Sequence, residues 1–168
     1  MTQSDRKKGS FKKGASSSGS VSADLEDRDS LIKISDGVAK VRSDIDDTNW
    51  ILYRFDSAKK NIHYHASGSG GYSQFVQEVR DELVMFGLLR FDMDDGDKGG
   101  GGFRPTKFVF VTWIGPDVPA LVRAKANAEI KRVGREMSPF HIGHTAESFE
   151  DLDPAIIVGK LKSVGFNL

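Results

Sequence analysis

The 168-residue sequence contains no cysteine. This excludes disulfide bonds, cysteine-ligated zinc or iron–sulfur sites, and a thiol nucleophile. No stretch approaches the roughly 20 apolar residues of a membrane-spanning helix, and the basic N-terminus lacks the apolar segment of a secretory signal. The 24 basic and 24 acidic residues cancel, so attraction to an acidic partner has to come from a local patch. We expect a monomeric protein of the cytoplasm.

Residues 1–29 and residues 30–168 differ in composition. The first segment is rich in serine and glycine and has few large apolar side chains. Such a segment cannot bury enough surface to offset the entropy cost of ordering it. We predict a disordered tail over residues 1–29, with a basic first half, and one folded domain over residues 30–168.

The longest apolar run extends from Lys107 to Gly115, and Thr112 is the only polar residue between those two ends. A short run of this kind is typical of a strand that is buried on both faces, in the interior of a sheet. Helices must then cover both faces of the sheet, which predicts three layers.

The spacing of apolar residues predicts nine elements in the order helix, strand, strand, helix, strand, strand, helix, strand, helix. The first helix is expected to begin at Ser30 as its N-cap and to extend its apolar stripe to Ile45, and the second to cover residues 72–86 and end at Gly87. The remaining elements are expected over residues 50–55, 62–66, 88–93, 107–114, 118–137, 140–146 and 154–165. The fold class is therefore α/β (α+β), with a mixed sheet of five to six strands sandwiched by four helices.

The predicted helix over residues 118–137 is apolar on one side and basic on the other. With ~100° per residue, the side opposite the apolar stripe holds Lys125, Lys131, Arg132 and Arg135, with Arg123 on the flank. Taken alone, this pattern is equally typical of a solvated cationic face. Lys107, at the start of the adjacent buried strand, adds a second basic feature. Together they predict one contiguous site for an acidic partner.

Other motifs lack the context that their chemistry requires. His141 and His144 bound the tetrapeptide of class I aminoacyl-tRNA synthetases, but here it follows no Rossmann-type glycine-rich turn. His63 and His65 share one strand face without a third metal ligand, so a solvated face is the better interpretation. The acidic, glycine-rich segment 92–103 fits neither an EF-hand nor a phosphate-binding loop. We predict no catalytic residue, no metal site and no cofactor, hence no enzyme.

The stretch Lys107–Gly115, followed by Leu121-Val-Arg-Ala-Lys125, closely resembles the coactosin-like branch of the actin-depolymerising-factor homology (ADF-H) family. Arg90-Phe91, Phe75-Val76 and the opening helix, two strands and helix also match, and the resemblance spans about residues 30–168. It implies a mixed sheet between helix pairs, and binding to actin, with filaments preferred over monomers, at the cytoskeleton. The implied contact residues are Lys107, Arg123 and Lys125, which match the family motif, and Lys131 and Arg132 farther along the same helix.

The resemblance also implies binding to the side of the filament without strong severing, and interference with barbed-end capping. The loop over residues 94–106 is acidic where the family carries basic residues, which favours weak severing. One alternative is a cofilin-like severing or depolymerising factor. An alternative of another class is an anionic-lipid or nucleic-acid-binding module that uses the basic tail and helix. The neutral net charge and the absence of an aromatic platform argue against this last alternative.

Overall fold

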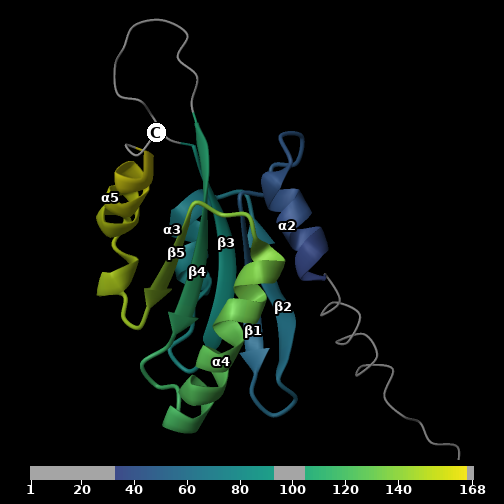
Figure 1. Cartoon of the computed structure of the whole chain (residues 1–168), viewed down its shortest axis with the longest axis vertical. Coiled ribbons are helices and arrows are strands. Elements are labelled where there is room, and N and C mark those ends of the chain that lie inside the picture. The colour runs from purple at the N-terminus through teal and green to yellow at the C-terminus, as the bar shows by residue number, and fades with distance from the viewer. Residues whose placement is uncertain (1–32, 93–104, 166–168) are drawn as a thin grey trace, which may run out of the picture.

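The computed structural model describes residues 33–92 and 105–165. The predicted tail, the predicted N-cap Ser30 and most of the loop that follows Asp92 lie outside these ranges. Figure 1 shows a twisted sheet with helices on either side of it.

Ten elements are described along the chain. They are α2 (Ile34–Arg42), β1 (Trp50–Asp56), β2 (Asn61–Gly68), α3 (Gly71–Glu78), β3 (Val84–Asp92), β4 (Thr106–Ile114), α4 (Ala120–Met137), β5 (Ile142–Ala146), the 3₁₀ helix η1 (Glu150–Leu152) and α5 (Pro154–Gly165). The five strands form one sheet in the order β2-β1-β3-β4-β5. All neighbours are antiparallel except β4 and β5, which are parallel. The predicted fold class, a mixed sheet with four covering helices, is confirmed.

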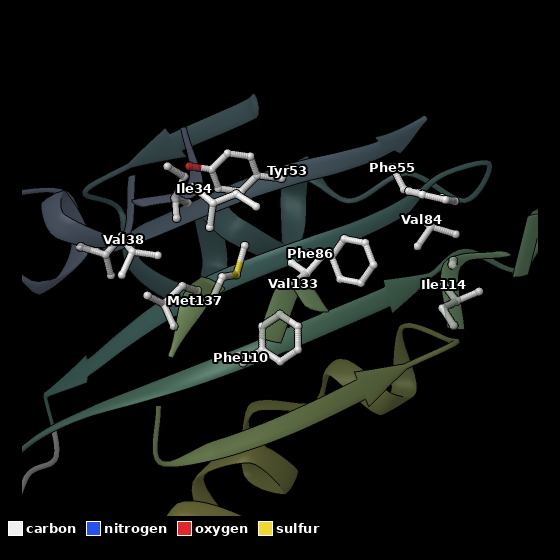
Figure 2. Close-up of a cluster of buried hydrophobic side chains, with 14 of the residues drawn as sticks. Ile34, Val38, Tyr53, Phe55, Val84, Phe86, Phe110, Ile114, Val133 and Met137 are labelled. Atoms are coloured by element: carbon white, nitrogen blue, oxygen red, sulfur yellow. The ribbon is translucent and has the colours of Figure 1, made fainter. Parts of the chain in front are cut away.

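Two apolar cores lie on the two faces of the sheet, as the three-layer prediction requires. On one face α2 and α4 pack through Val38, Ala126, Val133 and Met137 against side chains such as Phe86 and Phe110. Figure 2 shows this core, with Val133 and Met137 pointing toward Phe110 of β4. On the other face α3 and α5 supply Phe75, Ile157 and Leu161, and Val79, directly after α3, joins them. No helix in the two described ranges is long and apolar enough to cross a membrane.

Strand β4 is an interior strand, as its sequence predicts. From Val109 to Ile114 every side chain is buried. Phe110 and Ile114 belong to one core, and Val109, Val111 and Trp113 belong to the other. The strand starts one residue earlier than predicted, at Thr106, and its first three residues are half-buried. Lys107 therefore lies at the beginning of the strand, where burial ends.

The predicted second helix is too long. α3 ends at Glu78, and the segment from Val84 onward is strand β3, whose first six residues are all buried. Gly87 is not a helix stop, because it lies inside β3, where a Cβ atom would come within 2.6 Å of the Phe75 ring. The continuous apolar run that begins near Leu83 is the pattern of a strand buried on both faces, which outweighs the helical spacing there.

The first helix also ends earlier than predicted. α2 stops at Arg42, and Ile45, which the helical spacing places in its apolar stripe, is 98% exposed. Arg90 of β3 explains the early end, since its Nη1 donates to the Ser43 carbonyl at 2.9 Å and its Nη2 contacts the Asp44 carboxylate at 2.9 Å. These contacts fix the chain immediately after the helix.

Candidate functional site

Helix α4 is the longest helix of the described residues and presents one whole side to solvent. It begins after Pro119, whose fixed φ suits a helix start. Its inner stripe, ending in Val133 and Met137, is buried against the sheet as predicted. Its outer side carries Leu121, which is 68% exposed. This side of the 18-residue helix thus combines an exposed leucine with charged side chains, which makes it a candidate for a protein contact.

The two cations near the start of α4 are held by the protein's own backbone. Arg123 donates from Nη2 to the Gly115 carbonyl at 3.0 Å and from Nε to the Val118 carbonyl at 3.3 Å, and its Nη1 lies 3.3 Å from Glu147. Lys125 donates from Nζ to the carbonyl of Ser57, in the β1–β2 turn, at 3.3 Å. Arg123 therefore stabilises the β4–α4 connection, while Lys125 has one long hydrogen bond and stays half-exposed.

Arg132 and Lys131 are neighbours in the sequence, but only the charge of Arg132 is compensated by nearby carboxylates in the described residues. Arg132 lies between Glu129 at 2.6 Å and Glu136 at 2.7 Å, and its hydrogen bond to Glu129 raises the pKa of the guanidinium. Lys131 is exposed and forms no ion pair within residues 33–92 and 105–165. The predicted basic side of α4 is therefore divided, with a neutralised flank at Arg132 and a free cation at Lys131.

Lys107 lies at the opposite end of the site from Arg123 and Lys125. It neighbours His141, because the amide of the next residue, Phe108, donates to His141 Nδ1 at 2.9 Å. Burial is the main cause that lowers the pKa of His141, and the positive charge of Lys107 lowers it further. Arg123 instead contacts Gly115, which follows β4 directly and lies eight residues after Lys107. Lys107 and Gly115 are therefore about 26 Å apart. The predicted adjacency of Lys107 to Arg123 and Lys125 is therefore wrong, because these residues lie at opposite ends of β4. α4 runs antiparallel to β4, so the start of the helix meets the end of the strand (Figure 1).

Arg42 is a structural cation that the sequence did not reveal. Its Nη2 donates to the carbonyls of Met137, at 3.2 Å, and Pro139, and its guanidinium lies 5.1 Å above the Phe108 ring. It thus binds the carbonyl end of α4, where a cation also complements the helix dipole. The only sequence signal was a basic residue in the last turn of α2, which is too common to be specific.

The side chains of His63, His65 and His144 contact other groups of the fold. His144 is buried, with its ring nitrogens 2.7 Å from the Asp151 carbonyl and 2.8 Å from Lys160 Nζ. His63 and His65 are half-buried on the edge strand β2, each beside a separate carboxylate, and burial lowers the pKa of His65. Within the described ranges, no three acidic, histidine or cysteine side chains gather as metal ligands.

Comparisons with known proteins agree with this fold. Residues 30–162 match the family of cofilin/tropomyosin-type actin-binding proteins. The coactosin-like protein of Mus musculus is 28% identical over 125 residues, which cover 74% of this chain and 82% of the relative. Coactosin of Dictyostelium discoideum is 30% identical over 105 residues, covering 62% and 66%.

Solved structures give the same result. The crystal structure of coactosin from Entamoeba histolytica has a TM-score of 0.72 at 22% identity, covering 80% of this chain and 94% of the other. The solution structure of mouse coactosin, described as an actin filament binding protein, has a TM-score of 0.60 at 28% identity, covering 74% and 84%.

Proposed function

The chain belongs to the cofilin/tropomyosin-type actin-binding protein family as a coactosin-like member, and we propose that it binds the side of actin filaments. It does so as a monomer at the cytoskeleton of the cytoplasm. It is a binding protein and not an enzyme. It does not sever strongly, and it opposes barbed-end capping. The mouse relative that is described as a filament binder supports filaments over monomers as the target.

The outer side of α4 is the observation that carries this proposal. Its first half exposes Leu121 among small side chains, Ala124 and Ala128, so a partner surface can approach the helix backbone closely. Its second half exposes the cations Lys131 and Arg135. An apolar anchor followed by charge is the pattern of a helix that docks in a groove with an acidic border.

Lys107 provides a second contact region. Because it lies about 26 Å from the start of α4, one small acidic spot cannot bind both. A long filament surface, which offers acidic groups at many positions, can. The separation therefore requires a partner with acidic groups at two places, which a filament surface can offer. Two weak contacts on one rigid body also raise affinity beyond that of either contact alone.

The five predicted contact residues differ in how available their charges are to an acidic partner. Lys107, Lys125 and Lys131 are available to an acidic partner, whereas Arg132 is already neutralised by two glutamates. Arg123 is committed to backbone carbonyls and Glu147. We assign Arg123 and Arg132 chiefly to shaping the helix surface, with a smaller direct share in binding.

Co-sedimentation with actin filaments tests the proposal. The full chain should pellet with filaments at low salt and less so at physiological salt, because surface charges are screened over about 8–10 Å. A protein that stays in the supernatant at low salt would refute filament binding. Filament lengths under the microscope should stay close to those without the protein, while rapid shortening would identify a cofilin-like severing factor.

A pair of variants locates the contact. Leu121→Ser removes the exposed apolar anchor of α4, and we expect it to weaken pelleting without loss of stability. Ile156→Ser is the matched control, since Ile156 is 42% exposed on α5, on the other face of the sheet. Equal effects of the two substitutions would argue against α4 as the docking helix.

A further inference from the structure

The turn between β1 and β2 carries two lysines that have no role in the contacts described above. Lys59 and Lys60 are both exposed, and neither forms an ion pair within residues 33–92 and 105–165. The carboxylate of the turn, Asp56, lies instead 3.7 Å from His63 Nε2. Counted against the two lysines, Asp56 leaves the turn with a net positive charge. The turn can therefore attract an acidic partner.

Hydrogen bonds give this turn a fixed shape. Asp56 Oδ1 accepts from the amides of Lys59, at 3.2 Å, and Ala58, at 2.9 Å. These hydrogen bonds are the main causes that lower the pKa of Asp56, so its carboxylate is ionised at neutral pH and holds the turn closed. Lys60 has a φ of 54°, in the left-handed region, where asparagine and glycine are much commoner than lysine. The geometry of the turn does not account for a lysine there.

Lys125 joins the turn to α4. Its Nζ donates to the carbonyl of Ser57 at 3.3 Å, and Figure 1 shows the β1–β2 turn and the start of α4 at the same end of the molecule. Lys125 follows Leu121 by four residues, so the two side chains are neighbours on the helix surface. The turn therefore stands beside the part of α4 that is proposed to dock on the filament.

We infer that the β1–β2 turn belongs to the filament-binding surface and that Lys59 and Lys60 contact acidic groups next to those that α4 meets. Lys125 is then a positioning residue as well as a contact, because its hydrogen bond to Ser57 holds the turn at the edge of α4. The sign of the charge supports this assignment, since an acidic surface that attracts the cations of α4 also attracts a basic turn beside them. The inference rests on the proposed docking of α4 and adds two contact residues from a separate part of the chain.

Co-sedimentation of charge-reversed full-length protein with actin filaments tests the inference. In the double variant Lys59→Glu/Lys60→Glu, two attractions become repulsions, so the Kd should rise at least about fivefold at low salt. Lys162→Glu is the matched control, since Lys162 is exposed on α5, on the other face of the sheet, and it should bind like wild type. Failure of the wild type to pellet would refute filament binding itself. A wild type that pellets beside a turn variant of equal affinity, or an equal loss in Lys162→Glu, would overturn only the role of the turn.

Lys60→Asn separates binding from folding. Asparagine adopts the left-handed region more readily than lysine, so the thermal midpoint should stay at the wild-type value or rise. Loss of the charge should nevertheless weaken filament binding by up to about fivefold. A variant with wild-type affinity would exclude Lys60 from the contact, whatever its midpoint.

The positioning role of Lys125 is tested by combining Lys125→Ala with Lys59→Ala. Because Lys125 holds the turn, its removal should already loosen the contact of Lys59 with the filament. The double variant should therefore weaken binding by less than the product of the two single effects. Effects that multiply would show that Lys125 contributes its charge alone and does not position the turn.

Discussion

Lys107 and Lys125 should contribute independently to filament binding, because they lie at opposite ends of the molecule. Lys107 pairs with Phe91 in the sheet, and Lys125 contacts Ser57, beyond the other end of β1. Across about 26 Å of water, two unit charges interact with only about 0.2 kcal/mol, and screening by physiological salt reduces this to about 0.01 kcal/mol. A double-mutant cycle should therefore show no coupling.

The cycle compares wild type, Lys107→Ala, Lys125→Ala and the double variant by co-sedimentation at one salt concentration. Loss of an exposed ion pair costs about 0.2–1 kcal/mol, so each single variant should weaken the Kd up to about fivefold, and the two factors should multiply in the double variant. Lys162→Ala, on the exposed side of α5, is the control and should bind like wild type. A coupling energy above about 1 kcal/mol would mean that both lysines contact one shared acidic spot, which contradicts the two-ended site.

Three further predictions concern the framework of the site. Arg42→Ala should lower the free energy of unfolding by about 1–3 kcal/mol, because two carbonyls at the end of α4 lose their donor and Phe108 loses its cation; an unchanged urea midpoint would show that Arg42 is not a clamp. Gly87→Ala should destabilise by about 1–3 kcal/mol, since its methyl group would overlap the Phe75 ring, and a wild-type thermal midpoint would refute this packing. The Glu147 amide and Ser148 lower the pKa of Asp151, so its stabilising effect is complete above the ordinary carboxyl pKa and is lost as the pH falls through the lowered folded value; Asp151→Asn should flatten the acid side of the stability profile, and an unaltered profile would contradict the assignment.

The sequence predicted the layers better than the boundaries. The β4 run has only one physical interpretation, since six consecutive buried residues need cover on both faces. The stretch from Leu83 to Leu89 was ambiguous, because its apolar residues continue the helical spacing of α3 and also form an uninterrupted run. Pairing with β1 and β4 on either side makes this stretch a strand. Contacts of this kind are absent from local patterns.

The buried side of α4 was predictable from the sequence, but the arrangement of its charged side chains was not. Helical periodicity correctly placed the buried stripe of α4 that ends in Val133 and Met137. It could not show that Glu129 and Glu136 neutralise Arg132, nor that α4 runs antiparallel to β4 and thus separates Lys107 from the start of the helix. Chain direction and side-chain pairing are tertiary properties, so a basic stripe in a sequence does not establish a basic surface.

An electron cryomicroscopy reconstruction of actin filaments decorated with this protein tests the central claim most directly. We predict that the outer side of α4, with Leu121, is buried against actin and that Lys107 makes a second contact at a separate place on the filament surface. A reconstruction in which α4 faces solvent while another surface holds the filament would contradict the proposed binding mode.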